Sequence, residues 1–265
     1  MSDPVRLTRS DGIALLEMAR PDTRNAFSDE IKSGLSDALQ TLTEATDLRA
    51  LIFTGSDGVF CAGGDLKAML ERHRSGHKNT AEDMRNRMLE LHVWFKKLRD
   101  LPVPVIVAVD GPAFGAGLGL ALCGDIVLAS DRALFSASFT KVGAVPDCNL
   151  MWSLPRVVGQ QRAREMFFTA RTVDAQEALR LGLCMEVLPA EKLLPRAKEI
   201  AAMMENVSPT AYALTKEIMA HAMQADSDTI LKMEADAQAK CLTSEYHLDA
   251  IGRFASKTPP AFNFK

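Results

Sequence analysis

The chain lacks the features that would place a protein in a membrane or in a secretory pathway. No apolar run approaches the roughly 20 residues that a membrane-spanning helix needs. The initial segment, MSDPVRLTRSDG, has neither the apolar stretch of a signal peptide nor the Arg-rich, acid-poor pattern of a transit peptide. We therefore expect a cytoplasmic protein with no membrane partner.

An excess of one charge and a paired arrangement of cysteines are also missing. The 31 Lys and Arg residues nearly balance the 34 Asp and Glu residues, and a net charge of -3 gives no reason to expect a nucleic acid partner. The five cysteines are scattered and mostly lie in apolar surroundings, which favours reduced core residues over disulfides or metal ligands. With 47% hydrophobic residues among 265, the chain can build a substantial core.

The common nucleotide and hydrolase motifs are absent as well. Gly115, Gly117 and Gly119 fail the GxGxxG pattern because the sixth position is Leu120, and neither GxxxxGK[ST] nor GxSxG occurs. His73 and His77 are four residues apart without carboxylate support. We expect no metal and no cofactor.

The stretch Pro104 to Asp125, PVIVAVDGPAFGAGLGLALCGD, is the most patterned part of the chain. Its β-branched run Val105 to Val109 predicts a buried strand, and the small apolar residues Phe114 to Leu122 predict a core helix. Backbone N–H groups near Ala116 can approach a ligand closely because the flanking residues are glycines, and a helix start favours negative charge.

The remaining segments alternate between strand and helix patterns, which predicts an α/β fold. After Pro189 all patterns are helical, and we place the boundary between an α/β core, residues 1–194, and a helical C-terminal segment, residues 195–265. Strands are predicted at 13–18, 49–54, 125–129, 133–138 and 183–188, and further helices begin near Ser28, Leu66, Cys148, Thr172, Glu191, Pro209 and Ser227.

A second glycine loop, CAGGD around Gly64, also follows a strand and precedes a helix. Two such loops can direct two N–H donors at one oxygen, and a preorganised donor is worth about 3 kcal/mol on a developing negative charge. The alternative is that these glycines only permit close packing of helix against strand.

At this point the sequence resembles the crotonase family, the enoyl-CoA hydratase/isomerase group, over nearly its whole length. The resemblance implies a spiral of β-β-α units, a helical C-terminal segment that forms trimers or dimers of trimers, and an acyl-CoA thioester as substrate. The matching segments, in order, are RPDTRNAF (20–27), FCAGGDL (60–66), VAVDGPAFGAGLGLALCGDIVLAS (107–130), FTKVGAVPD (139–147), LPRVVG (154–159) and DAQEALRLGLCMEVLP (174–189).

The same resemblance assigns roles to single residues. It implies that the backbone N–H groups of Gly64 and Ala116 hold the thioester oxygen, in agreement with the two-loop interpretation. The positions that it implies for coenzyme A binding, the last two often contributed across a subunit boundary, are Arg24, Ala26, Ala62, Asp65, Leu66, Phe254 and Lys257.

The acid/base residues depart from those of the hydratases, which are similar to one another in having two glutamates. Gly119 and Phe139 stand at the matching positions, and neither can transfer a proton. Asp147 matches the acidic residue of some isomerases of the family, and we expect it to be catalytic. The alternative role for an Asp after a Pro is an N-cap of the helix that follows.

These residues favour a Δ3,Δ2-enoyl-CoA isomerase in which Asp147 alone moves the proton. The alternatives are a hydratase that uses Asp147 by itself, a hydrolase resembling the 4-chlorobenzoyl-CoA dehalogenases, which have a Trp where this chain has Phe139, and a non-catalytic acyl-CoA-binding subunit. The Met-rich segment 67–94 suits an irregular apolar pocket, and a plain helical core stripe is the alternative.

Overall fold

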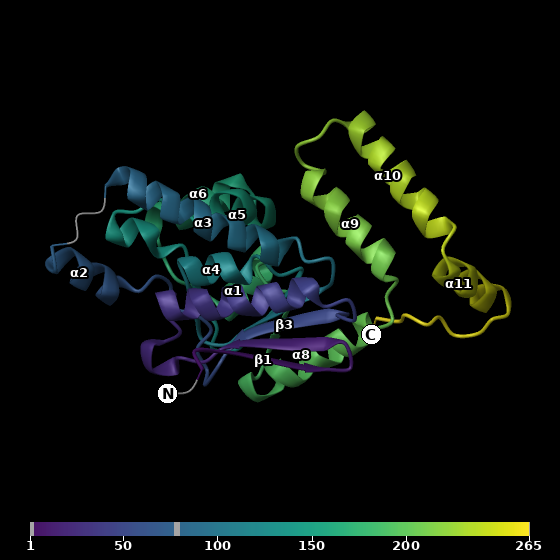
Figure 1. Ribbon diagram of the computed structural model, residues 1–265, viewed down its shortest axis with the longest axis horizontal. Helices are drawn as coiled ribbons and strands as arrows, with labels where there is room; N and C mark the ends of the chain where they lie inside the picture. The colour runs from purple at the N-terminus through teal and green to yellow at the C-terminus, as the bar shows by residue number, and fades with distance from the viewer. Residues whose placement is uncertain (1–2, 77–79, 265) are drawn as a thin grey trace.

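A mostly parallel sheet lies at the centre of the computed structural model, which describes residues 3–76 and 80–264 (Figure 1). In this part of the chain the central sheet has the strand order β1-β2-β3-β4-β6-β9, and a smaller sheet has the order β5-β7-β8. In the central sheet β1 pairs antiparallel with β2, and the other pairs are parallel. The strands are β1 Val5–Ser10, β2 Ile13–Met18, β3 Ala50–Gly55, β4 Val105–Val109, β5 Pro112–Phe114, β6 Ile126–Ser130, β7 Leu134–Ser136, β8 Val173–Asp174 and β9 Glu186–Leu188.

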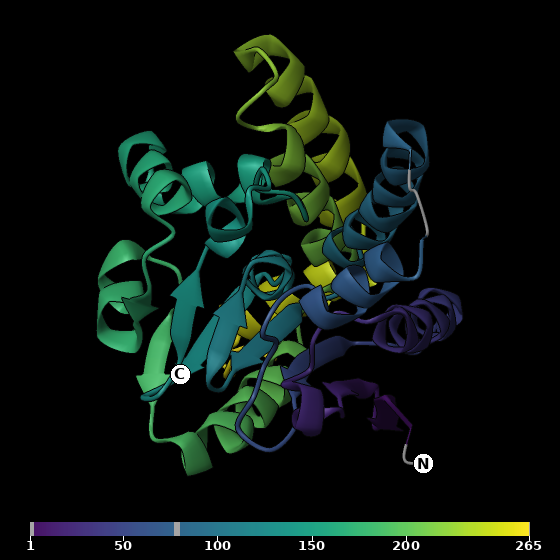
Figure 2. The ribbon, with the colours of Figure 1, turned by 90° about the vertical axis from the view of Figure 1, so that its left-hand side faces the viewer.

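Helices cover both faces of the central sheet (Figures 1 and 2). They are α1 Asp29–Glu44, α2 Leu66–Arg74, α3 Ala81–Arg99, α4 Ala116–Ala121, α5 Leu150–Val158, α6 Gln160–Thr169, α7 Ala175–Leu181, α8 Ala190–Met204, α9 Pro209–His221, α10 Ser227–Leu242 and α11 Glu245–Ala255, with short 3-10 turns at Pro21–Thr23 and Ser138–Val142.

Strand β4 shows why this sheet is buried on both sides. All five of its residues are buried, and successive side chains alternate between two cores. Val105, Val107 and Val109 face the larger core, which includes residues of α1, α3 and α4. Ile106 and Ala108 face a smaller core that residues of α8 close. The β-branched run therefore forms a central strand, as predicted.

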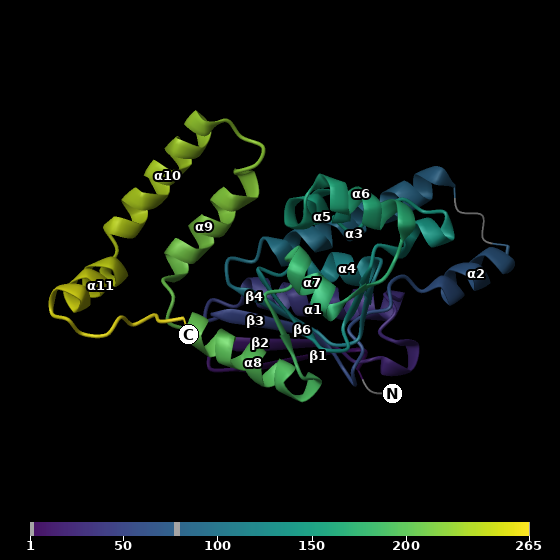
Figure 3. The ribbon, with the colours of Figure 1, turned by 180° about the vertical axis from the view of Figure 1, so that it is seen from behind.

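Helices α9 to α11 extend away from the core as an arm (Figures 1 and 3). Among the described residues of these three helices, only Ala237 is buried. An ion pair of 2.7 Å between Lys216 Nζ and the Asp125 carboxylate ties α9 to the start of β6. The arm's exposed large apolar side chains are Met219, Met223, Leu231, Leu242, Tyr246, Leu248, Ile251 and Phe254.

The α/β class expected from the sequence is confirmed, and several local features differ from those expected. The expected helix 114–122 is shorter, because Pro112–Phe114 pairs as β5 before α4 begins. The helix expected to begin near Ser227 ends at Leu242, and Ser244 caps a second helix, α11. Strand β1 and helix α6 were not predicted. The expected boundary after residue 194 falls inside α8, which packs on the sheet on both sides of Pro195.

Candidate active site

The Gly64 loop is held between two neighbouring segments. On one side the Cys61 N–H donates to the Pro112 carbonyl at 2.8 Å, and the Phe114 N–H donates to the Cys61 carbonyl at 3.0 Å. On the other side the Phe27 N–H donates to the Gly63 carbonyl at 2.7 Å. The loop therefore lies between the segment RPDTRNAF and β5, the strand that leads into α4.

A turn at Gly115 begins α4 next to this loop. Gly115 has φ 52° and ψ −114°, a conformation that a side chain would strain, and its N–H donates to the Ser136 carbonyl at 2.9 Å. A methyl group on Gly63 would lie 2.7 Å from the Phe114 carbonyl oxygen and 3.9 Å from the Ala116 nitrogen. The two glycine loops, separate in sequence, are therefore in contact, as expected.

The two proposed donors are not used elsewhere in the fold. Within residues 3–76 and 80–264, no hydrogen bond is made by the backbone N–H of Gly64 or of Ala116. Gly64 is exposed, whereas Ala116, the first residue of α4, is buried. Two unused N–H groups on adjoining loops fit a site that stabilises an oxyanion.

Asn25 stabilises the neighbouring loop, and the sequence interpretation gave it no role. It is fully buried, accepts from the Arg20 N–H at 2.7 Å and donates from Nδ2 to the Val59 carbonyl at 2.6 Å. Arg24 and Asn25 both have left-handed backbone, with φ of 54° and 49°. Asn tolerates that conformation, and this preference was the available signal.

The other residues expected to bind coenzyme A divide into two groups. Five of them, Arg24, Ala26, Ala62, Asp65 and Leu66, lie around the Gly64 loop. The Ala62 N–H donates to the Arg24 carbonyl at 3.0 Å, and Asp65 caps α2 by accepting from the Ala68 N–H at 2.9 Å. Ala26 is part-exposed and Leu66 is exposed. Phe254 and Lys257 lie in and after α11, far from α2 within one chain (Figures 1 and 3).

Asp147 does not cap the following helix, so that alternative role is wrong. The N-cap of α5 is Asn149, which makes no side-chain cap hydrogen bond, and the Asp147 carbonyl accepts from the Leu150 N–H at 3.0 Å. The side chain is part-buried, and its Oδ1 atom has no hydrogen-bond partner among the described residues. Because such an orphaned acceptor destabilises the fold, it is more typical of a functional carboxylate than of a structural one.

The two positions where hydratases resemble one another in having glutamate carry no carboxylate here, and position 119 has no room for a side chain. A methyl group on Gly119 would lie 2.6 Å from the Cys148 carbonyl oxygen and 2.7 Å from its Cβ. Phe139 lies beside the turn that begins α4, with its ring 3.7 Å from the position of a methyl group on Gly115. Asp147 is therefore the carboxylate that remains near α4.

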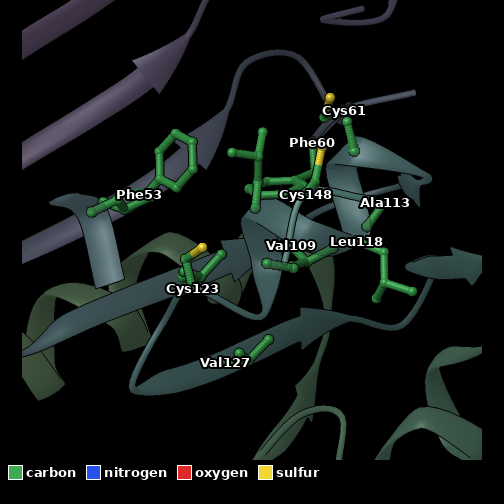
Figure 4. Close-up of a cluster of buried hydrophobic side chains, with 14 of the residues drawn as sticks. Phe53, Phe60, Cys61, Val109, Ala113, Leu118, Cys123, Val127 and Cys148 are labelled. Carbon is green, nitrogen blue, oxygen red and sulfur yellow. The ribbon is translucent and has the colours of Figure 1, made fainter. Parts of the chain in front are cut away.

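The buried thiols near the site are not nucleophiles. Cys61 and Cys148 share one apolar cluster with Ala113 and Leu118 (Figure 4). Burial raises the pKa of the Cys61 thiol to about 12. Burial, followed by the charge of Asp147, raises the pKa of the Cys148 thiol far above its ordinary value. Both therefore remain protonated, and a thiolate is the form that reacts.

A pocket of about 680 Å³ opens between α1, α2 and α3. Its apolar wall consists of Phe27, Met69, Met84, Met88, Leu91 and Trp94. The end of the Met69 side chain would lie 3.4 Å from a methyl group on Gly64, so the pocket adjoins the Gly64 loop. The Met-rich segment thus lines a pocket, which was one of its two interpretations.

One carboxylate joins the three helices at the polar side of this pocket. Asp29 of α1 pairs with Lys32 at 3.1 Å, with Arg72 of α2 at 3.0 Å and with Arg87 of α3 at 3.8 Å. The hydrogen bond from Lys32 is the main reason why the pKa of Asp29 is below its ordinary value. Helix α2 has no buried residue, so these pairs contribute to its placement.

Two further features bear on the expected absence of a metal and a membrane. Among the described residues, no group of three or more His, Cys, Asp or Glu side chains is arranged to hold a metal ion. His77, one of the pair four residues apart, lies outside the described residues. No described helix is long and apolar enough to cross a membrane.

Comparison with known proteins identifies the family that the sequence resembles. Residues 8–265 match the enoyl-CoA hydratase/isomerase family. The chain is 32% identical to a 1,2-epoxyphenylacetyl-CoA isomerase of Escherichia coli, over 96% of each chain. It is 33% identical to a short-chain-enoyl-CoA hydratase of Clostridium acetobutylicum, over 96% of this chain and 95% of the relative.

Solved structures agree with these relatives. An enoyl-CoA hydratase/isomerase from Cupriavidus metallidurans superimposes with a TM-score of 0.92 at 38% identity, covering 98% of this chain and 96% of the other. The chain therefore belongs to the enoyl-CoA hydratase/isomerase family, has the crotonase fold and is an enzyme of that family.

Proposed function

We propose that the protein is a Δ3,Δ2-enoyl-CoA isomerase that needs no cofactor and uses one carboxylate. The observation that supports this most directly is that neither Gly119 nor Phe139, at the two hydratase glutamate positions, can transfer a proton, while Asp147 keeps an unpaired buried oxygen. The name of the Escherichia coli relative, an isomerase of an aryl-acetyl-CoA derivative, is consistent with proton or bond shifts next to a thioester.

In the proposed mechanism, the thioester oxygen accepts hydrogen bonds from the Gly64 and Ala116 N–H groups. Asp147 removes a proton from the carbon α to the thioester, and the electron pair moves to the oxygen to give a dienolate. The two donors stabilise that charge. Protonated Asp147 then returns the proton to the γ carbon, so the double bond moves into conjugation and the carboxylate is regenerated.

The acyl group is proposed to enter the pocket between α1, α2 and α3. Met69 connects that pocket to the Gly64 loop, so a thioester bound there can extend its chain along Met84, Met88 and Leu91. The coenzyme A part is proposed to lie along Arg24, Ala62 and Leu66. Phe254 and Lys257 would complete the binding site of a neighbouring subunit in a trimer or a dimer of trimers, in the cytoplasm.

Replacement of Asp147 by Asn tests the assignment. Turnover of a 3-enoyl-CoA should fall by about 10²-fold to 10⁴-fold, the usual contribution of an acid/base group, while coenzyme A binding by titration calorimetry stays unchanged. Asp131→Asn, at an exposed position outside the site, is the matched control and should keep full turnover. Undiminished isomerisation by Asp147→Asn would refute the proposed mechanism.

Hydration is the second candidate, because the Clostridium acetobutylicum relative is named a hydratase. In that reaction Asp147 alone would activate a water molecule for addition to a 2-enoyl-CoA. Crotonyl-CoA hydration, measured beside 3-enoyl-CoA isomerisation, ranks the two activities. Hydrogen exchange at the α carbon in heavy water detects enolate formation for either reaction, and its absence despite tight binding would indicate a non-catalytic subunit. A covalent ester on Asp147 would instead indicate the dehalogenase-like reaction.

A further inference from the structure

The backbone that follows Asp147 is unusual, and it fixes where this carboxylate stands. Cys148 and Asn149 are both left-handed, with φ of 53° and 64°. Asn adopts this conformation readily, but for an ordinary L-residue such as Cys it costs roughly 1–2 kcal/mol. Contacts elsewhere must therefore hold Cys148 in place.

Helix α4 provides those contacts at Gly119. Cys148 is 2% exposed, and a methyl group on Gly119 would come within 2.6 Å of its carbonyl oxygen and 2.7 Å of its Cβ. The surface of α4 is therefore open at residue 119 only because no side chain is there. Cys148 packs into this space, one helical turn from Ala116, whose N–H is the proposed donor.

Apart from its interaction with the Cys148 thiol, the Asp147 side chain has no comparable anchor of its own. Its Oδ1 atom lacks a hydrogen-bond partner in the part of the chain that the structure describes, and it does not cap α5. The position of the carboxylate consequently depends on the backbone of residues 147 to 149. That backbone is fixed on α4 through Cys148 and on α5 through the Leu150 N–H, 3.0 Å from the Asp147 carbonyl.

We propose that Cys148, packed against Gly119, is a positioning residue that sets the place of the Asp147 carboxylate relative to the Ala116 N–H. This inference rests on the proposed function, in which both groups act on one thioester. The contact joins the acid/base to the same six-residue helix that presents the donor. The thiol stays protonated and transfers no proton, so Cys148 acts through its packing, its backbone and its contact with the Asp147 side chain.

Two single variants disturb the contact from opposite sides. Cys148→Gly accepts the left-handed backbone without strain but leaves the space on α4 unfilled. Gly119→Ala keeps Cys148 and fills that space. A misplacement of about 1 Å costs on the order of 10²-fold in rate, so kcat should fall by about 10-fold to 100-fold in each variant, with KM within about twofold.

The double variant Cys148→Gly, Gly119→Ala tests the contact itself. The alanine methyl then no longer meets the Cys148 Cβ, although it still lies close to the carbonyl oxygen of residue 148. This partial relief should make the loss of kcat smaller than the product of the two single losses. Cys184→Ala removes another buried thiol, at 5% exposure and outside the site, and should lower the melting temperature with kcat unchanged. If Gly119→Ala fails to fold, Cys148→Gly still gives the answer through its kcat and KM.

Cys148→Gly in an Asp147→Asn background separates the positioning role of Cys148 from the catalytic role of Asp147. If Cys148 acts through Asp147, Cys148→Gly should cause no further loss of the residual kcat there. A loss of the same factor in both backgrounds, or single variants that change only the melting temperature, would overturn the positioning role while leaving Asp147 catalytic. Full turnover by Asp147→Asn alone would overturn the proposed function, and the positioning role with it.

Discussion

Helices α2 and α4 each begin beside a proposed oxyanion donor, yet they are packed in opposite ways. Every residue of α4, Ala116–Ala121, is buried, and its glycines allow backbone contact with Cys61 and Cys148. No residue of α2, Leu66–Arg74, is buried, and Leu66, Met69 and Leu70 are about half exposed, at 53%, 55% and 49%. One donor is therefore fixed by the core, whereas the other lies at the edge of the pocket.

This difference indicates a division of tasks between the two halves of the site. The α4 side cannot change without moving the core, so it suits the invariant part of the substrate, the thioester carbonyl. The α2 side is held by exposed ion pairs and flexible Met side chains, so it suits the variable part, the acyl chain. Substitutions on the two sides should accordingly differ in kind and in size.

Among the substitutions that compare the two sides, the largest effect is expected from Gly117→Ala on the α4 side. The new methyl group would lie 2.3 Å from the Cys61 carbonyl oxygen and 3.0 Å from its Cβ, so α4 and the Gly64 loop must separate. We expect the free energy of unfolding in urea to fall by about 3 kcal/mol and α-proton exchange in heavy water to slow by about 100-fold.

The control is Gly252→Ala in α11, where a methyl group meets no atom within 4 Å. It should raise the free energy of unfolding by about 0.5–1 kcal/mol, because Ala favours a helix more than Gly does. Equal effects of the two substitutions would contradict the tight packing of α4.

A smaller and more selective effect is expected from Met88→Ala on the pocket side. The kcat/KM for medium-chain acyl-CoA substrates should fall by about 10-fold, because the truncated wall loses apolar contact, while short-chain substrates keep their rate. Leu89→Ala on the same helix is the matched control, since Leu89 is 47% exposed and does not line the pocket. Uniform losses over all chain lengths would place the acyl group elsewhere.

The smallest effect is expected from Asp29→Asn, which removes the carboxylate that joins α1, α2 and α3. Its partners are partly exposed, so the loss in free energy of unfolding at neutral pH should be below about 1 kcal/mol. Because folding lowers the pKa of Asp29, its contribution is complete above the ordinary Asp value and disappears as the pH falls through the folded value.

Urea denaturation of wild type and variant at several pH values checks this prediction. The difference between the two proteins should be largest near neutral pH and should vanish in acid. Asp37→Asn, an exposed position on the same helix, should show no such difference at any pH. A difference that persists in acid would mean that Asp29 acts through packing instead of charge.

The sequence predicted the parts of this molecule that depend on local pattern. The β-branched run of β4, the amphipathic α1 and the two glycine loops were correctly placed because each follows from the spacing of neighbouring residues. The break between α10 and α11 was not predicted, although serine is a common N-cap residue. In the structure Ser244 caps α11 by accepting a hydrogen bond from the His247 N–H.

Contacts between distant segments could not be predicted in this way. The hydrogen bonds of Asn25, the pairing of Cys61 with β5 and the packing of Cys148 on Gly119 join residues far apart in sequence. No periodicity contains such information, because these contacts depend on how whole elements dock. The role of Gly119 in particular is visible only when the backbone of Cys148 is seen against it.

The contact between Gly119 and Cys148 also limits which sequences this enzyme can reach by single mutations. A glutamate introduced at residue 119 would collide with the backbone of Cys148 before its carboxylate reached the site. A two-carboxylate site therefore requires the loop at residues 147–149 to change first or at the same time. A glutamate at residue 119 without a change in that loop should therefore destabilise the packing of Cys148 on α4.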